Sequence, residues 1–345
     1  IENLYLPAAG YYAGYPTDPA VRERTGSAAG SRTGALAGHW YLSTDIGCAF
    51  MALDGLSQYY ERTSDARVKR LLEEMIAVFR QIDFVGASMQ THASLSAARG
   101  ILRFYESTGD ESFLRTAEEL FALYCREGMT ENYANDNWFD RPGWTEPCAV
   151  IDSYMLASGL FDNTGDSRYL LIAQRIFYNA MGFAQRSNGG FGCDNCVGAQ
   201  EPFVHPKEEY FEAYWCCTMR GGEGLARAAE NMLRTDADTL YILRPGDADI
   251  ELDGQRIRMR ADFPRDTRVI LEMEGEGRWK HVRLYLPETA EAIRIASDEG
   301  KTAVSSLPTE DGIILPFSSG CRTEIPIRFL FGRRLRCANA RRASE

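Results

Sequence analysis

The sequence predicts an α domain followed by a β domain, in which repeated helical hairpins come first and a β-sandwich comes second. Three observations support this prediction. A short turn motif recurs three times between stretches of helical periodicity, the periodicity changes to that of β-strands near residue 236, and Gly, Pro and Asp separate the later runs. The 345-residue chain is long enough for two domains with sizeable cores.

The helical part is marked by a turn motif that ends in Thr-x-Asp. Its copies lie 45 and 56 residues apart, at 59–65, 104–110 and 160–166. A Gly in the turn suits the left-handed end of one helix, and the Asp suits the N-cap of the next. The predicted N-caps are Asp65, Asp110 and Asp166. Apolar residues at helical spacing follow them, over 67–79, 112–124 and 168–181. Each unit is therefore helix, turn, helix, and such an array forms an open solenoid or a closed toroid.

The β part consists of short alternating runs rich in β-branched residues. They occupy 240–246, 250–264, 268–274, 281–287, 312–317 and 324–331. Short strands with regular turn signals are typical of a β-sandwich. We therefore predict an irregular segment over 1–40, a helical catalytic domain over 41–235 and a β-sandwich over 236–345.

Charge and hydropathy narrow the classes of partner. The net charge of −11 disfavours nucleic acid and anionic membrane surfaces and favours a neutral glycan or small molecule. No apolar run is long enough for a transmembrane helix, and residues 1–10 lack the features of a signal peptide. A cytoplasmic location is expected, although a chain that starts without Met leaves export open. A homodimer is one assembly that the sequence allows.

Several of the nine cysteines lie close together in sequence. Cys148 follows Glu146 by two residues, and Cys216 is adjacent to Cys217. Thiolates and carboxylates both bind zinc, and residues two apart at the start of a helix can point the same way. A competing site would use the Cys-x-x-Cys pair formed by Cys193 and Cys196 with two further thiols. The remaining alternative is that all of these are buried small side chains. Four cysteines in core-like or strand-like contexts are expected to be structural: Cys48, Cys125, Cys321 and Cys337.

The ordered combination of these motifs resembles a known family. Thr-Gly-Asp hairpins, WTEPCAV at 144–150, TGDSRYLLIAQRIFYNAM at 164–181 and a late Cys-Cys pair together resemble the β-L-arabinofuranosidase family of glycoside hydrolases. The resemblance covers about residues 40–235, and the β runs resemble the family's C-terminal sandwich. The chain departs from the pattern as a divergent or N-terminally shortened member would. Pro147 replaces the usual Thr, CCTMRGG replaces CCPPN, and about seven helices precede residue 236 where a toroid of six hairpins has twelve.

The resemblance implies a closed (α/α) toroid that holds one zinc ion through a Glu and three Cys. The residues that match the family's ligands are Glu146, Cys148, Cys216 and Cys217. It further implies that Cys216 is the nucleophile and that Glu131, one short loop upstream of Glu146, is the acid/base. His92 matches a histidine near the sugar.

Other side chains are expected to line a glycan cleft. His39 is a candidate beside His92, and aromatic faces can stack on sugars. The aromatic residues near the ligand segments are Tyr133, Trp138, Phe139, Trp144, Tyr214 and Trp215, of which Trp144 and Trp215 are the leading candidates. Ordinary core packing is the alternative for about half of these aromatics. His205 and His281 are expected to be bystanders.

The sequence thus predicts a retaining glycoside hydrolase with a zinc-bound thiolate nucleophile and a terminal β-L-arabinofuranoside as substrate. Two other functions stay open. One is an inactive glycan-binding relative with a structural zinc. The other is a toroid hydrolase or lyase that relies on carboxylates alone.

Overall fold

The computed structural model describes the helical part almost continuously and the β part as separate segments. The described residues are 35–37, 40–42, 48–86, 88–140, 142–198, 202–206, 216–236, 238–252, 254–262, 265, 268–274, 281–285, 290–292, 296–297, 313–316 and 322–329. The chain forms two compact units, Ile1–Ala229 and Glu230–Glu345. The domain boundaries predicted from the sequence, at residues 40 and 235, stay predictions.

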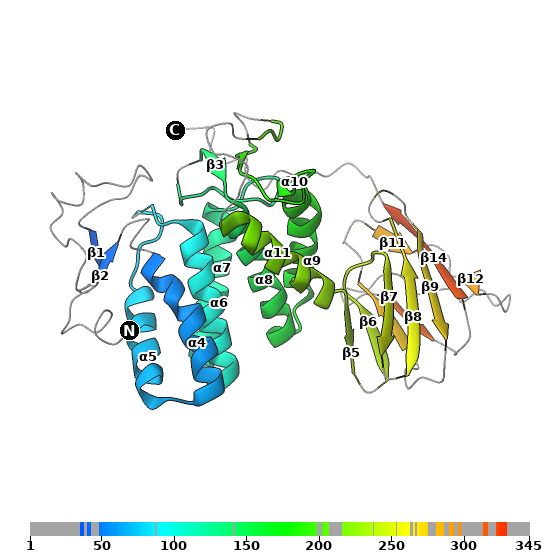
Figure 1. Ribbon diagram of the computed structural model, residues 1–345, viewed down its shortest axis with the longest axis horizontal. Helices are drawn as coiled ribbons and strands as arrows, with labels where there is room; N and C mark the ends of the chain where they lie inside the picture. The colour runs from blue at the N-terminus through cyan, green and yellow to red at the C-terminus, as the bar shows by residue number, and fades with distance from the viewer. Residues whose placement is uncertain are drawn as a thin grey trace. The chain divides into compact units, whose positions relative to one another are not determined.

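The first unit is helical (Figure 1). Its α-helices are α4 (Ala52–Thr63), α5 (Ala66–Phe79), α6 (Thr91–Thr108), α7 (Glu111–Glu127), α8 (Pro147–Thr164), α9 (Ser167–Ile176), α10 (Gly182–Ala184) and α11 (Cys216–Glu230). A 3-10 turn, η2 (Cys48–Met51), precedes α4, and a π-helical turn, η3 (Phe177–Met181), follows α9. Two short antiparallel pairs complete it, β1 (Ala35–Ala37) with β2 (Trp40–Leu42) and β3 (Trp144–Thr145) with β4 (Asp194–Asn195).

The predicted helix–turn–helix units are confirmed at all three places. Gly109 and Gly165 end α6 and α8 with left-handed φ angles of 72° and 70°. Ser64 takes that conformation after α4, with φ 51°. Each turn is followed by an Asp whose side chain accepts a hydrogen bond from the backbone N–H two residues later, as an N-cap does. The helix predicted over 168–181 is α-helical only to Ile176, after which the backbone widens into the π turn.

Helices α6 and α8 lie at the centre of the helical unit. Helix α6 packs against α4, α7 and α8, and α8 also packs against α9. Both are buried along almost their whole length, which explains why α8 reads as apolar on every side. Contact with α4 is so close that a Cβ on Gly100 would lie 2.4 Å from the carbonyl carbon of Leu53. Within the described residues, none of the helices combines the length and the apolar character needed to cross a bilayer.

The second unit contains two sheets. One has the order β13-β10-β6-β5 and the other β11-β14-β9-β8-β7, with β12 beside β14. The bounds are β5 Leu233–Thr235, β6 Thr239–Ile242, β7 Ala248–Leu252, β8 Gln255–Arg260, β9 Arg268–Glu274, β10 His281–Leu284, β11 Ala290–Ala292, β12 Ala296–Ser297, β13 Ile313–Pro316 and β14 Arg322–Phe329. One apolar core draws Leu240 and Val282 from the first sheet and Ile257 and Val269 from the second.

The run predicted as one strand over 250–264 is instead a hairpin. Strands β7 and β8 pair antiparallel, with Leu252 opposite Gln255, so only two residues connect them. The second is Gly254, with φ 78°. Two-residue hairpin turns need positive φ, which Gly adopts without strain. The Asp-Gly pair at 253–254 was the sequence signal for this turn.

Candidate metal centre and active site

Three helix N-termini supply the side chains of the candidate site. Cys148 is the second residue of α8, and Cys216 and Cys217 are the first two residues of α11. His92 is the second residue of α6. The N-terminus of a helix carries partial positive charge, which stabilises carboxylates and lowers the pKa of thiols in general. The fold therefore gathers acidic ligand groups where three helices favour negative charge.

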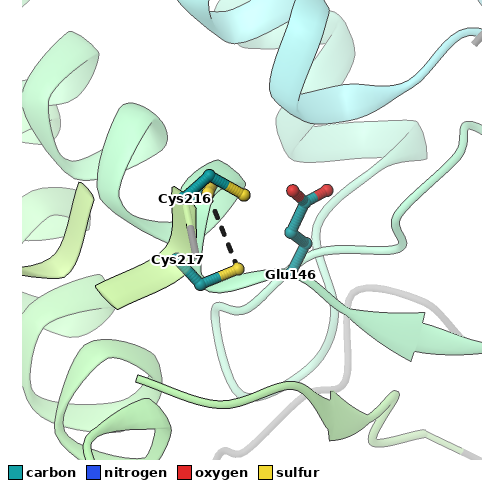
Figure 2. A group of neighbouring side chains, drawn as sticks. Glu146, Cys216 and Cys217 are labelled. Carbon is teal, nitrogen blue, oxygen red and sulfur yellow. Dashed lines mark hydrogen bonds between the residues drawn. The ribbon is translucent and has the colours of Figure 1, made fainter. Parts of the chain in front are cut away.

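The four ligands implied by the family resemblance come together. One ligand atom from each of Glu146, Cys148, Cys216 and Cys217 lies within 4.8 Å of all the others. The Sγ atoms of Cys148 and Cys217 are 3.6 Å apart. Figure 2 shows the Glu146 carboxylate facing the sulfur atoms of Cys216 and Cys217. Cys216 is exposed, whereas the other three residues are buried.

The donor set fits a zinc ion. Zinc in proteins is held tetrahedrally by thiolate, imidazole or carboxylate ligands, with Zn–S near 2.3 Å, which places two sulfur atoms of one tetrahedron about 3.8 Å apart. The separation of Cys148 and Cys217 Sγ, 3.6 Å, is close to that value. Three soft sulfur donors also disfavour magnesium or calcium.

Three of the four groups have a pKa above the usual value. Hydrogen bonds with Cys216 and Cys217, together with burial, raise the pKa of Cys148. Burial also raises the pKa of Glu146. The hydrogen bond from Cys148 lowers the pKa of Cys216, but the hydrogen bond with Cys217 and burial outweigh it, so the net shift is upward. A bound divalent cation would lower these raised pKa values, because its charge favours the ionised ligands.

Local structure fixes Glu146 in place. It is the N-cap residue of α8, and Pro147 occupies the first helical position, where proline suits the backbone. The departure from the family's Thr is thus compatible with the helix start. The Glu146 backbone N–H donates to Asn135 Oδ1 at 3.1 Å, and Gln90 Nε2 donates to the Glu146 carboxylate at 3.2 Å.

His92 lies beside this cluster and is bound to a residue that sequence reasoning missed. Its Nδ1 is 2.7 Å from Asp152 Oδ2. Burial lowers the pKa of His92, but the hydrogen bond and charge of Asp152 outweigh it, so the pKa lies above its usual value. The charge of His92 acts on both Glu146 and Cys216. The sequence signal for Asp152 was a single acidic residue inside the apolar run 149–157.

The other predicted site residues are placed as follows. Glu131 is exposed in the loop between α7 and β3, outside the group of four. Trp144, in β3, is half-buried and packs edge-on against Trp138 at 5.6 Å. His39 and Trp215 lie outside the described residues, so their roles stay predictions.

The competing Cys-x-x-Cys pair flanks strand β4. Cys193 is buried and Cys196 is half-buried, and neither belongs to the group of four. Cys196 Sγ lies 3.6 Å from the carbonyl oxygen of Asn135, whose side chain contacts Glu146. This pair therefore lies next to the structure that supports Glu146 without joining the candidate metal centre.

Comparison with solved structures identifies the fold. A glycoside hydrolase superposes with a TM-score of 0.64 at 13% identity, over 83% of this chain and 59% of its own. The GH127 β-arabinofuranosidase BT3674 gives a TM-score of 0.62 at 15% identity, over 80% of this chain and 51% of its own. The chain has the GH127 fold. A GH127 β-L-arabinofuranosidase from Geobacillus stearothermophilus T6 also matches, with a TM-score of 0.56 at 14% identity, over 79% of this chain and 53% of its own.

The resemblance predicted from the sequence is thus confirmed at the level of the fold. No protein-family model matches the sequence, and no curated protein is similar to it. The chain spans between half and three fifths of the length of these three solved structures.

Proposed function

We propose that this protein is a retaining glycoside hydrolase that cleaves a terminal β-L-arabinofuranoside at a zinc–thiolate centre. The observation that carries the proposal is the convergence of one carboxylate and three thiols within 4.8 Å, with Cys216 as the exposed member. The GH127 fold supports the assignment. We further propose that the helical hairpins belong to an (α/α) toroid and that the two sheets form a β-sandwich around their shared core.

In this proposal Glu146, Cys148, Cys216 and Cys217 hold the zinc ion. When bound, zinc would keep the thiols ionised at neutral pH and fix the positions of their sulfur atoms. Three buried ligands anchor the site, while exposed Cys216 can reach a substrate. Because three thiolates and a carboxylate outweigh the charge of one divalent ion, the site retains negative charge, which favours an oxocarbenium-like transition state.

The reaction uses two residues of the chain in two steps. In the first, Cys216 Sγ bonds to the anomeric carbon while Glu131 donates its proton to the departing glycosidic oxygen. In the second, Glu131 takes a proton from water, and the water oxygen displaces the sulfur with retention of configuration. His92 binds a sugar hydroxyl, and His39, Trp144 and Trp215 line the cleft.

The nucleophile is tested by Cys216→Ser, with hydrolysis of 4-nitrophenyl β-L-arabinofuranoside and zinc content measured on the same preparation. We expect turnover to be lost in protein that still contains zinc. Cys125→Ser is the matched control, because Cys125 lies in α7 outside the group of four, and it should keep both zinc and activity. Turnover by zinc-loaded Cys216→Ser would exclude Cys216 as nucleophile.

The acid/base is tested by Glu131→Ala. General acid–base catalysis typically contributes about 10²- to 10⁴-fold, so a loss in this range is expected. Azide, which needs no deprotonation, should restore turnover and give a β-linked glycosyl azide. An unchanged rate in the variant would show that Glu131 is not the acid/base.

A further inference from the structure

The helices that meet at the candidate site carry polar stripes at helical spacing. Helix α6 presents His92, Ser96 and Arg99, which follow one another by four and three residues, and all three are buried. On α8 the residue one turn after Cys148 is Asp152, which is fully buried. Helix α11 has the same spacing in Cys216, which is exposed, and in Arg220 and Glu223, which are half-buried. Each stripe begins at the site, and those on α6 and α8 continue into the buried interior of the helical unit.

The carboxylate of Asp152 joins these stripes. Its Oδ2 accepts hydrogen bonds from His92 Nδ1 at 2.7 Å and Ser96 Oγ at 2.6 Å. Its Oδ1 accepts from Arg99 Nη1 at 2.6 Å and lies 3.6 Å from Arg220 Nε. One carboxylate of zero exposure therefore faces four donors from two other helices.

The arginines and His92 affect Asp152 in different ways. Arg99 and Arg220 neutralise the carboxylate, and both also pair with Glu223, at 3.1 and 2.5 Å. Burial raises the pKa of Asp152, but Arg99 and His92 outweigh it, so the pKa lies below its usual range. An ionised carboxylate only accepts hydrogen bonds. His92 Nδ1 must therefore carry a proton, which leaves Nε2 as the second polar atom of the ring.

Ion pairing alone does not account for this arrangement. The two guanidinium groups would suffice to neutralise Asp152, yet its Oδ2 is occupied by His92 and Ser96. The charge of His92 also acts on Glu146 and Cys216. An imidazole ring whose Nδ1 is hydrogen-bonded to a buried carboxylate has a fixed orientation and a fixed tautomer.

We propose that Asp152 is a positioning residue that holds His92 with Nδ1 protonated and so presents Nε2 to the candidate site. The donor to Nε2, a sugar hydroxyl, rests on the proposed function; the orientation of His92 does not. Ser96 fixes Oδ2 from the other side, and Arg99 and Arg220 tie Asp152 to α6 and α11. The tautomer of His92 is thereby set by a residue four positions after Cys148.

The experiment is a long-range ¹H–¹⁵N NMR spectrum of the histidine rings in the full chain, recorded at alkaline pH, where His92 is neutral. The chain has four histidines, so the His92 signals are assigned by their loss in His92→Gln. We expect a protonated Nδ1 and an unprotonated Nε2 in the unaltered protein. The Nε2-protonated tautomer in that protein would overturn the proposal without recourse to any variant.

Asp152→Asn then tests the cause. An amide in place of the carboxylate no longer requires a donor at His92 Nδ1, so we expect the Nε2-protonated tautomer to appear. Asp166→Asn is the matched control, because Asp166 is the half-buried N-cap residue of α9 and Asn is an equally good N-cap. It should leave the tautomer unchanged. Retention of the native tautomer in folded Asp152→Asn would overturn the role of Asp152.

Kinetics separate this proposal from the proposed function. In zinc-loaded Asp152→Asn we expect kcat/KM for the arabinofuranoside to fall at least 10-fold, with zinc content unchanged. An unchanged kcat/KM alongside a switched tautomer would overturn the positioning role. If the unaltered protein hydrolyses no arabinofuranoside, the proposed function fails, and the NMR result still decides whether Asp152 sets the tautomer.

Discussion

Replacement of Arg99 by Met should strongly destabilise the helical unit. The Arg99 side chain is 8% exposed, with Nη1 2.6 Å from Asp152 and Nη2 3.1 Å from Glu223. Methionine fills similar space without charge and leaves the buried carboxylate of Asp152 short of its main partner. Removal of one partner of a buried ion pair typically costs about 3–5 kcal/mol. At about 2–4 °C per kcal/mol for a unit of this size, the midpoint should fall by roughly 6–20 °C.

The size of this effect should depend on pH. The pKa of Asp152 is held below its unfolded value of about 3.9, so its stabilising contribution is present above that pH and is lost as the pH falls through the folded pKa. Without Arg99, burial raises the pKa of Asp152, and the carboxyl can then take up a proton at higher pH. The stability difference between native protein and variant should therefore be largest near pH 7 and narrow below about pH 4.

Urea unfolding followed by circular dichroism at 222 nm measures this difference, because the helices of the described residues belong to the first unit. Arg168→Met is the control. Arg168 forms an ion pair with Asp166 at 2.5 Å, but the Arg168 side chain is 80% exposed. Surface pairs of this kind contribute little. If Arg99→Met is no more destabilising than Arg168→Met at pH 7, the buried network does not stabilise the helical unit.

Three further predictions follow from the helix packing and the thiols. Gly100→Ala should destabilise by about 1–3 kcal/mol or more, because its Cβ would meet the α4 backbone at 2.4 Å. Gly55→Ala, where the added Cβ meets open space on α4, should instead stabilise by about 0.5–1 kcal/mol. A higher melting temperature for Gly100→Ala than for Gly55→Ala would contradict this helix packing. Burial raises the pKa of Cys125 to about 12, so iodoacetamide at pH 8 should modify it only after unfolding, as mass spectrometry can verify. Zinc binding at pH 7 should release about three protons, one per cysteine, as measured by calorimetry in buffers of different ionisation enthalpy, and zinc affinity should fall as the pH falls. Binding without proton release would exclude thiolate ligation.

The hairpin turns were predictable because their determinants are local. A left-handed residue followed by an Asp cap involves side chain and backbone only two residues apart, as at Gly109 and Asp110. The four candidate ligands were found through the motif resemblance, and the fold brings them together. Proline at the first position of α8 also followed from local rules.

The buried network could not be predicted in the same way. Asp152 meets His92, Ser96 and Arg99 from 60, 56 and 53 residues away, and no periodicity encodes which buried polar residues will pair across helices. The polar stripe on α6 and the single Asp in α8 were visible in the sequence, but their partners depend on helix packing. Cys216 is exposed and Cys217 is buried, and this difference likewise depends on how the start of α11 packs.

The central claim is that Glu146, Cys148, Cys216 and Cys217 form a zinc centre, and zinc content measured together with free thiols tests it most directly. The reduced 345-residue chain should hold about one zinc ion, with three cysteines protected from a thiol reagent until a chelator removes the metal. Cys196→Ser should change neither value, since Cys196 lies outside the group of four. Two results together would contradict the account. The purified protein would contain no metal, and added zinc would protect none of the nine cysteines that react in the unfolded chain.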